Sequence, residues 1–408
     1  MKKIIQLILK FLARRVIKKY NPLVIGITGS VGKTSTKEAL FTILKEKKKI
    51  RASPENYNNE IGLPLTILGF KVPEKKIGWL KIFWQSLFDL PEKEKYPEIL
   101  ILEMAADRPG DISYLLKIVK PQIGILTAVS AAHLEYFKSV ENVFEEKKKL
   151  IEAVPSQGWV ILNKDDKLNA SLEKKVKSKI LTYGLQEAMV EALEISLEQE
   201  FKNDLLEIKG LFFKVKYEGN LVPVFLKEVV SLSQVYAVLA ALAVGLSLNF
   251  NLLDLVNCLS SYESPAHRFK LIKGKKETLI IDDSYNSSPK AVEEALKTLA
   301  EIKVHKEARK WIVLGEMLEL GKESEKLHYE LGKKIAKEKI DYLLTYGEKA
   351  KAFSKGAVEE GMVSKNIFSF EKQEELINFL KENIKRGDLI FIKGSRKMKM
   401  EKIVEALK

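Results

Sequence analysis

The sequence predicts an α/β protein in which a central domain with a mostly parallel sheet precedes a smaller, Rossmann-like α/β domain. Two observations carry this prediction. Short apolar runs rich in β-branched residues, which are typical of buried strands, alternate with helical patterns over most of the chain. The alternation breaks near residues 262–265 and then resumes. Two successive sheets with helical crossovers explain both features.

The central domain is expected to span residues 21–262. Its buried strands are predicted at residues 23–27, 98–102, 123–129 and 159–162. The helix after the first strand has one apolar face, formed by Ala39, Leu40, Ile43 and Leu44. Residues 190–228 change to an alternating pattern that indicates a β-rich section, and residues 231–246 read as an apolar helix.

The C-terminal domain is expected to span residues 263–408. Its strands are predicted at residues 279–281, 311–314, 342–345 and 389–392. The helix after the first of them has a clear start. Ser288 is a favourable N-cap, and Pro289 at the first helical position loses nothing by lacking an N–H group. This rhythm is typical of a doubly wound sheet.

The net charge of the chain limits the kinds of molecule that it is expected to bind. The chain carries a formal charge of +14, which suits nucleic acid, an anionic membrane or phosphorylated substrates, or simply a solvated lysine-rich surface. Because the lysines are interleaved with glutamates and no arginine-rich arm is present, we expect no nucleic-acid partner. A single cysteine, Cys258, excludes a disulfide framework and fits a reducing cytoplasm.

Two segments raise the question of a membrane. The chain has no apolar run long enough for a transmembrane helix. Residues 1–20 form a basic amphipathic helix without the features of a secretory signal. This helix either lies on an anionic membrane or covers part of the protein body. Residues 77–90 are rich in aromatic side chains and could be core, a substrate lid or a membrane contact.

The strongest local motif lies between the first strand and its helix, at residues 28–35. Its glycines allow backbone N–H groups to surround phosphate oxygens, and the helix N-terminus favours negative charge. Lys33 would reach the β- and γ-phosphates of a nucleotide, and Thr34 would bind Mg²⁺ through its hydroxyl. Ile27 replaces the first glycine of the usual pattern. The predicted nucleotide-binding residues of this loop are Gly29, Ser30, Gly32, Lys33, Thr34 and Ser35.

This loop variant resembles that of the Mur ligases and the related folylpolyglutamate synthetases, and further motifs narrow the resemblance. Residues 56–66, 132–139, 282–289, 313–321 and 393–396 resemble Mur ligase segments and follow one another in the family's order. The segment at 313–321 resembles most closely the members that add D-alanyl-D-alanine to a muramoyl tripeptide. The chain is therefore identified as a member of the Mur ligase family.

The resemblance implies ATP-dependent formation of an amide bond through an acyl phosphate. The implied substrates are a UDP-N-acetylmuramoyl tripeptide and D-alanyl-D-alanine, in the synthesis of peptidoglycan precursors. Two alternatives stay open at this point. One is a ligase of the same architecture that acts on another acceptor or amine. The other is a P-loop module without ligase activity.

The resemblance also implies a site with two Mg²⁺ ions, held by Thr34, Glu103, His133 and a carbamylated Lys147. Glu103 closes a predicted strand at the carboxyl end, where a carboxylate can hold a hard cation. The role of His133 rests on the family, because imidazole is not a preferred Mg²⁺ ligand. Only its spacing from His133 selects Lys147, because the run Lys147–Lys149 looks solvated. The implied catalytic residues are Lys33, His133 and Lys147.

Further residues are assigned by position in the family motifs. The resemblance places Arg268, Asp283, Tyr285 and Asn286 at the ATP site, from the C-terminal domain. It places the residues nearest to the other substrates at Asn58, Asn59, Lys393, Ser395 and Arg396.

Three departures from the family pattern stand out. Only about 22 residues precede the first strand, where Mur ligases carry a domain that binds the UDP-sugar. We expect either a shorter or lipid-linked acceptor, or a partner protein that supplies this domain. Residues 231–237 do not match the family's adenine-binding helix, and His267 replaces a glycine. We expect a cytoplasmic monomer, at the inner membrane surface if the first helix binds lipid.

Overall fold

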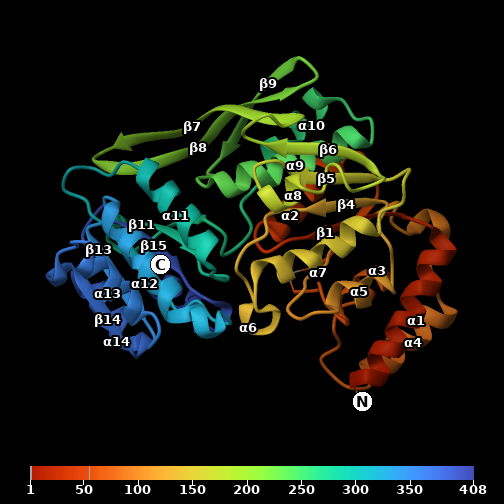
Figure 1. The fold of residues 1–408 in the computed structure, drawn as a ribbon, viewed down its shortest axis with the longest axis horizontal. Coiled ribbons are helices and arrows are strands. Elements are labelled where there is room, and N and C mark those ends of the chain that lie inside the picture. Colours follow the sequence, from red (N-terminus) through yellow and green to blue (C-terminus); the bar gives the residue numbers. More distant parts are fainter. Residues whose placement is uncertain (1, 55) are drawn as a thin grey trace.

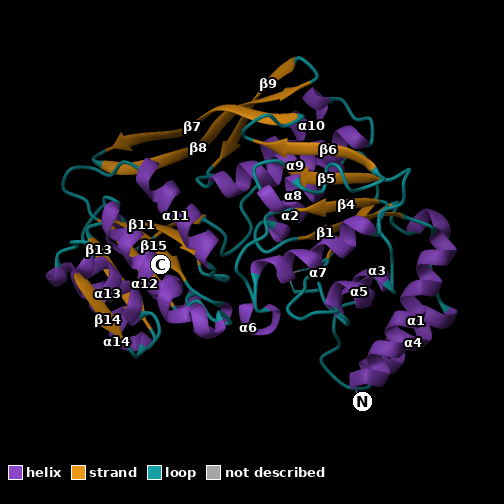
Figure 2. Cartoon of the chain, viewed as in Figure 1, coloured by secondary structure: helices purple, strands orange, loops and turns teal. Residues whose placement is uncertain are grey.

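A computed structural model describes residues 2–54 and 56–408, and it contains two sheets with helices on both faces of each (Figures 1 and 2). The nine-stranded sheet has the order β2-β3-β1-β4-β5-β6-β7-β8-β9, and the six-stranded sheet has the order β10-β11-β15-β12-β13-β14. We call them the N-terminal and the C-terminal sheet. The predicted fold class is confirmed.

The N-terminal sheet is parallel from β2 to β7. Its central strand β1 (Leu23–Thr28) lies between β3 (Ile99–Glu103) and β4 (Ile123–Leu126). This order creates a switch point beside β1, where ligands bind in open α/β sheets. The other parallel strands are β2 (Ile50–Ala52), β5 (Trp159–Asn163) and β6 (Lys179–Gly184).

Two apolar clusters cover the two faces of this sheet. The first contains helices α2 (Lys33–Leu44), α9 (Leu232–Ser247) and α10 (Leu252–Cys258). The second contains parts of α1 (Lys2–Tyr20), α3 (Gly62–Leu68), α5 (Asp111–Leu116) and α7 (Val140–Glu152). The remaining helices of this part are α4 (Gly78–Phe88), α6 (Leu134–Phe137) and α8 (Lys167–Ala170). Both faces of a parallel sheet are thus buried, as its continuous apolar strands require.

The strands β7 (Val190–Lys202), β8 (Leu205–Tyr217) and β9 (Asn220–Lys227) are antiparallel and form the predicted β-rich section. The far end of the β7–β8 hairpin lies over the C-terminal sheet (Figure 1). Ile208 belongs to the apolar cluster of that sheet. The Gln199 side chain donates to the Glu301 carbonyl at 3.1 Å and accepts from the Lys303 N–H at 3.0 Å. The hairpin therefore connects the two sheets.

The C-terminal sheet is parallel except for its edge strand β10 (Lys270–Lys273). Its other strands are β11 (Leu279–Asp283), β12 (Lys310–Gly315), β13 (Tyr342–Tyr346), β14 (Ile367–Phe370) and β15 (Leu389–Lys393). One face is covered by α11 (Pro289–Glu301), α12 (Ser324–Lys337) and α13 (Lys351–Glu359), and the other by α14 (Gln373–Asn383) and α15 (Glu401–Leu407). Short 3-10 turns lie at Lys93–Lys95, Leu259–Ser261, Lys275–Glu277, Gly321–Glu323, Ser364–Asn366 and Arg396–Met398.

The structure corrects some details of the predicted elements. The strand predicted at residues 123–129 ends at Leu126, because the chain then turns to meet the phosphate loop. Ser288 occupies the N-cap position of α11, but its side chain makes no capping hydrogen bond. Residues 77–90 are not a core element: within α4 only Ile82 and Ser86 are buried. In the described part of the chain, no helix is both long and apolar enough to cross a membrane.

Asp388, just before β15, is fully buried and holds the start of that strand. Its carboxylate accepts hydrogen bonds from the Arg309 guanidinium at 2.6 Å, from the Trp311 indole at 2.9 Å and from the Lys385 N–H at 2.9 Å. We expect Asp388→Ala to lower the free energy of unfolding by about 3 kcal/mol, because it leaves the partly buried Arg309 guanidinium, the buried Trp311 indole and backbone N–H groups without their acceptor. Urea denaturation at constant m-value measures this loss. Asp388→Asn, which keeps one acceptor oxygen, should lose less, and an equal loss would contradict this account.

Candidate active site

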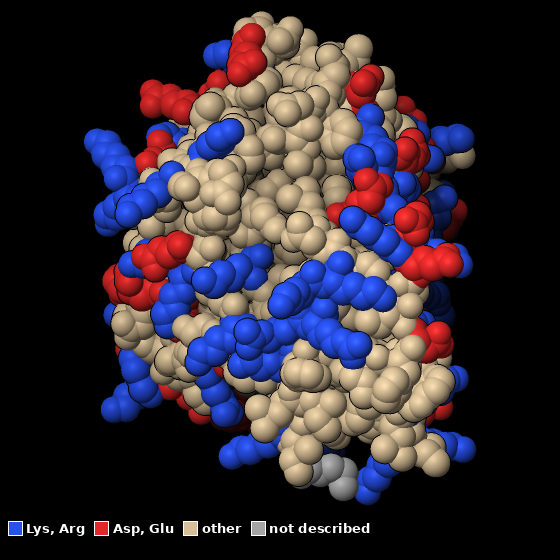
Figure 3. Space-filling view, turned by 90° about the vertical axis from the view of Figure 1, so that its right-hand side faces the viewer, with Lys and Arg blue, Asp and Glu red and all other residues tan. Residues whose placement is uncertain are grey.

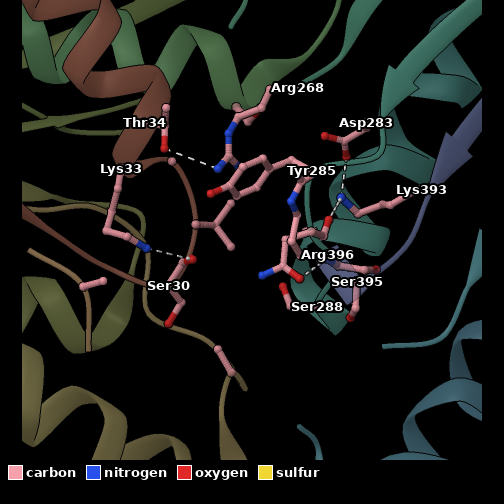
Figure 4. A pocket seen from close by; sticks show the side chains of 18 of the residues that line it. Ser30, Lys33, Thr34, Arg268, Asp283, Tyr285, Ser288, Lys393, Ser395 and Arg396 are labelled. Carbon is pink, nitrogen blue, oxygen red and sulfur yellow. Dashed lines mark hydrogen bonds and ion pairs between the residues drawn. The ribbon is translucent and has the colours of Figure 1, made fainter. Parts of the chain in front are cut away.

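A pocket lies between the two sheets and is lined by residues from both (Figure 4). On one side are the phosphate loop after β1 and the end of β3. On the other are the segments that follow β11 and β15. The carboxyl ends of these strands face one another across the pocket, so ligand groups from both parts meet there.

The geometry of the phosphate loop requires its glycines. Gly29 has φ +149°, and a Cβ atom there would lie 1.8 Å from the Thr127 hydroxyl. Gly32 has φ +91° and forms the N-cap of α2, which directs the helix N-terminus toward the pocket. The Ser30 N–H donates to the Ala128 carbonyl at 2.7 Å and closes the loop. Such a loop suits an anion such as phosphate.

Lys33 follows this loop directly, in the first turn of α2. Its ammonium donates to the Gly29 carbonyl at 2.7 Å. Burial lowers the pKa of Lys33, while the charge of Glu103 acts in the opposite direction. The lysine is therefore held within the loop by its own backbone, where a phosphate group can replace the carbonyl as its partner.

Hard oxygen ligands gather beside the loop. The Thr34 hydroxyl donates to Glu103 at 3.1 Å, and the Asn58 amide donates to the other oxygen of the same carboxylate at 3.1 Å. Glu103 ends β3 and is only 6% exposed. A hydroxyl and a buried carboxylate in contact at a phosphate site fit a small divalent cation. The described residues contain no cluster of three or more His, Cys, Asp or Glu side chains arranged for a metal.

Lys147 is buried, although the two lysines that follow it in the sequence are more exposed. Only 2% of it is exposed, whereas Lys148 pairs with Glu145 at 2.6 Å near the surface. Burial and, to a lesser extent, the nearby charge of Lys33 lower the pKa of Lys147 to about 7. The solvated appearance of residues 147–149 in the sequence is therefore wrong for Lys147. An amine with this pKa is partly neutral at physiological pH and can act as a nucleophile.

His133 joins the two parts of the protein. It adopts φ +54°, immediately before α6. Its Nδ1 lies 2.5 Å from the Glu319 carboxylate, which comes from the loop after β12, and its Nε2 lies 3.3 Å from Asp107. The Glu135 N–H also donates to the Glu319 carbonyl at 3.1 Å. Glu319 thus fixes the orientation of the imidazole and leaves Nε2 directed away from it.

On the prediction that His133 binds Mg²⁺, Glu319→Gln should raise the Mg²⁺ concentration needed for half-maximal phosphate release from ATP by about 10- to 100-fold, because the imidazole loses its orienting carboxylate. A Mg²⁺ titration of phosphate release measures this shift. Glu323→Gln, an exposed position in the same loop, is the matched control and should leave the titration unchanged. A Glu319→Gln curve that overlays the parent curve would show that the contact has no such role.

Arg268 and Tyr285 reach the phosphate loop from the C-terminal part. The Arg268 guanidinium donates to the Thr34 hydroxyl at 3.3 Å and lies over the Tyr285 ring, 4.1 Å from its centroid (Figure 4). The Tyr285 hydroxyl donates to the Asn56 side chain. Arg396 also lies against the Tyr285 ring, at 5.5 Å. Two guanidinium groups are thereby held next to the phosphate-binding residues by one aromatic ring.

Lys393 and Asp283 form a buried ion pair at the ends of β15 and β11. Lys393 also donates to the Asn286 carbonyl at 3.0 Å. Burial raises the pKa of Asp283, and the Lys393 charge opposes this effect. Nearby, the Ser395 hydroxyl accepts from the Leu318 N–H at 2.8 Å. These bonds fix the segments after both strands at the pocket wall.

The structure brings most of the sequence-predicted residues to this pocket. Its lining includes Ser30, Gly32, Lys33, Thr34, Ser35, Asn58, Glu103, His133, Arg268, Asp283, Tyr285, Asn286, Lys393, Ser395 and Arg396. Gly29, Asn59 and Lys147 do not line it. Gly29 supports the loop from behind, and Lys147 lies buried near Lys33. Asn59 accepts hydrogen bonds from the N–H groups of Ile61 and Gly62 and shapes the turn before α3.

Sequence reasoning missed several pocket residues, and three of them make contacts that shape the site. Asp107 and Glu319 contact His133, and Gln234 on α9 accepts a hydrogen bond from the Tyr262 hydroxyl at 2.5 Å while lining the pocket. Glu319 lies within the recognised segment 313–321, so that segment held the available signal. Gln234 lies in the helix that departs from the family pattern, so the sequence contained no signal for its place in the pocket.

His267, where the family has glycine, adopts φ +59°. This left-handed conformation costs a non-glycine residue energy. Two side chains hold the His267 ring in place: its Nδ1 lies 2.8 Å from the Asp282 carboxylate and 3.2 Å from the Ser284 hydroxyl. Its carbonyl accepts from the Tyr285 N–H at 3.2 Å. These contacts hold the backbone turn that precedes Arg268.

Comparisons with known proteins agree with this geometry. Residues 27–245 match the model of the Mur ligase middle domain, and residues 267–396 match that of the Mur ligase glutamate ligase domain. The UDP-N-acetylmuramoyl-tripeptide–D-alanyl-D-alanine ligase of Bacillus subtilis is 29% identical over 98% of this chain and 79% of its own length. The enzyme of the same name from Buchnera aphidicola is 30% identical over 95% of this chain and 75% of its own.

A solved structure gives the same result. The crystal structure of MurF ligase from Thermotoga maritima in complex with ADP has a TM-score of 0.78 and 29% identity, covering 98% of this chain and 82% of the other. The family models together account for both sheets and for the residues that face the pocket. The chain belongs to the Mur ligase family.

Proposed function

We propose that this chain joins D-alanyl-D-alanine to the terminal carboxylate of a UDP-N-acetylmuramoyl tripeptide, at the expense of ATP. The observation that carries the proposal is the contact between the two parts of the pocket. Arg268 from the C-terminal part donates to Thr34 of the phosphate loop at 3.3 Å, next to Lys33. The relatives that cover nearly the whole chain bear the name of this activity.

The first chemical step would form an acyl phosphate. A carboxylate oxygen of the tripeptide attacks the γ-phosphorus of ATP, the bond to the bridging oxygen breaks, and ADP leaves. Lys33 and the loop N–H groups bind the phosphates, and Arg268 stabilises charge on the transferred group. Because both reactants are anions, these cations lower the barrier chiefly by neutralisation and positioning.

The second step would use the amine of D-alanyl-D-alanine. It attacks the acyl carbon, loses a proton, and the resulting tetrahedral intermediate expels inorganic phosphate. Arg396 and Ser395 lie on the pocket wall opposite the phosphate loop and are proposed to bind this dipeptide. The contacts of Arg268, Tyr285 and Glu319 across the pocket would exclude water from the acyl phosphate.

Two Mg²⁺ ions are part of the proposal. The number follows from the resemblance to the Mur ligases, and Thr34 and Glu103 support one position with the oxygen ligands that this cation prefers. When bound, Mg²⁺ neutralises phosphate charge. Lys147 and His133 are proposed to complete the ligand set. The Lys147 ammonium first loses a proton, and addition of the neutral amine to CO₂ then forms an N–C bond and releases a second proton, which leaves a carbamate anion next to Lys33. This change replaces a repulsion by an attraction.

Phosphate release tests the proposal directly. ATP and Mg²⁺ are supplied with the UDP-muramoyl tripeptide and D-alanyl-D-alanine, singly and together, and products are identified by mass. We expect rapid release only with both substrates, together with the mass of the pentapeptide product. Release without any amine dependence would favour the non-ligase module. Nucleotide binding without product from this pair would overturn the proposed acceptor or amine.

The remaining assignments are also proposals. We propose domain limits at residues 1–20, 21–262 and 263–408, supported by the two sheets that lie within the last two ranges. We propose that the enzyme acts in the cytoplasm as a monomer and binds no nucleic acid. Gel filtration at working concentration tests the monomer.

A further inference from the structure

Helices α1 and α4 pack against each other and leave a shared apolar surface exposed. Leu9 of α1 and Ile82 of α4 are buried together with Leu65 of α3. The Arg15 guanidinium donates to the Leu87 carbonyl at 3.0 Å, which joins the two helices near their ends. Away from this contact, seven large apolar side chains point to solvent. We call them the α1/α4 face: Ile4, Leu7, Phe11, Ile77, Leu80, Trp84 and Phe88.

The exposure of this face is unlike that of the rest of the protein. All seven side chains are 60–72% exposed. Among the described residues, no other large apolar side chain exceeds the 55% of Val363. Trp84 and Phe88 also lie together, with ring centroids 6.1 Å apart. Such a concentration of exposed apolar area marks a binding surface.

The charged side chains of the two helices are of one sign. Neither α1 nor α4 contains an acidic residue, and together they carry eight basic ones: Lys2, Lys3, Lys10, Arg14, Arg15, Lys18, Lys19 and Lys81. Figure 3 views this side of the molecule and shows Lys and Arg gathered across its middle, with Asp and Glu toward the edges. Along α1 the exposed positions change from apolar at Ile4, Leu7 and Phe11 to basic at Arg14 and Lys18.

We propose that the α1/α4 face binds the surface of an anionic lipid bilayer. Apolar and aromatic side chains beside a basic rim suit the boundary between acyl chains and negatively charged headgroups. The helices would lie in the plane of that boundary, because neither is long and apolar enough to cross it. Protein interfaces, in contrast, are depleted in lysine, which is the commonest charged residue of α1 and α4.

The binding face is connected to the pocket through α1 and the loop before α3. The Gln6 amide donates to Glu60 at 2.8 Å, and Lys2 pairs with the same carboxylate at 3.1 Å. Glu60 follows Asn58, whose side chain contacts Glu103 in the pocket. These contacts link α1 to the segment that forms one wall of the pocket. The inference does not depend on the identity of the substrates.

Cosedimentation of the full chain with vesicles tests the proposal. One set of vesicles is pure phosphatidylcholine, and the other contains phosphatidylglycerol. The test variant is Phe11→Glu/Trp84→Glu, which places two acidic residues on the face. The control is Leu253→Glu/Phe225→Glu, at the exposed apolar positions of α10 and β9. Circular dichroism and phosphate release with soluble substrates verify that each variant is folded.

We expect the parent chain and the control to bind anionic vesicles at least about 10-fold more strongly than neutral ones, and less strongly at high salt. The Phe11→Glu/Trp84→Glu variant should lose at least about 10-fold of this binding. Parent chain that stays in solution with both vesicle types overturns the proposal. So does a test variant that binds like the parent. Sedimentation showing a parent dimer that the test variant abolishes would instead assign the face to a second copy.

Discussion

Replacement of Lys147 by alanine should lower the rate of ligation by at least about 1000-fold, a loss typical of removing a charge-stabilising group from such a site. The reason is its buried amine. At pH 7 an ordinary lysine is neutral in about one molecule in three thousand, whereas a pKa of about 7 makes roughly half of Lys147 neutral. Only the neutral amine adds to CO₂. The parent should therefore lose activity in CO₂-free buffer and regain it with bicarbonate.

The pH dependence of this effect has a defined sign. Lowering the pH through about 7 protonates Lys147 and removes the carbamate, so activity at limiting bicarbonate should rise with pH across this point. The ¹³C signal of a carbamate, formed with labelled bicarbonate, should appear in the parent and be absent in Lys147→Arg. Lys148→Ala, which alters the adjacent surface lysine, is the matched control. Bicarbonate-independent activity in the parent would refute carbamylation.

Replacement of Lys33 by alanine should lower kcat by about 10³- to 10⁵-fold, because the phosphate loop then lacks its only cation. The loop N–H groups and the α2 N-terminus remain, so the affinity for ATP should fall less than kcat. Steady-state phosphate release and equilibrium nucleotide binding separate these two quantities. Lys45→Ala, at the exposed end of α2, should match the parent. Equal losses in binding and turnover would show that Lys33 contributes to binding alone.

The local parts of the site could be predicted from the sequence, and its long-range parts could not. The phosphate loop is a continuous segment whose glycines and strand–helix context are visible in the sequence. The contact of Arg268 with Thr34 joins residues 234 positions apart, so only the family resemblance could place them together. The same applies to His133 and Glu319, whose pairing depends on how the two sheets meet.

Burial was the property that the sequence pattern concealed. Lys147 lies in a run of three lysines, and only the packing of α7 onto β1 and β4 places it inside the protein. Asn59 belongs to a segment that fits a substrate-binding motif, and in the structure its side chain accepts hydrogen bonds from the turn before α3. For residues 1–20 the pattern left a membrane or the protein body as alternatives. In the structure one side of α1 packs on the protein body, where Leu9, Leu12 and Val16 are buried. The other side exposes Ile4, Leu7 and Phe11, which is the side proposed to bind a membrane.

The β7–β8 hairpin has a consequence for how the pocket works. It contacts the C-terminal sheet through apolar groups such as Ile208 and through the Gln199 hydrogen bonds, on the side away from the polar contacts of the pocket. The hairpin therefore confines the C-terminal part near the phosphate loop even when the contacts of Arg268 with Thr34 and of Glu319 with His133 are broken. Arg268 and Glu319 therefore have a high effective concentration at the phosphate loop, because the hairpin tethers the C-terminal part beside it. Most of the translational entropy of assembling the site is lost once, when the chain folds, and is not lost again in each catalytic cycle.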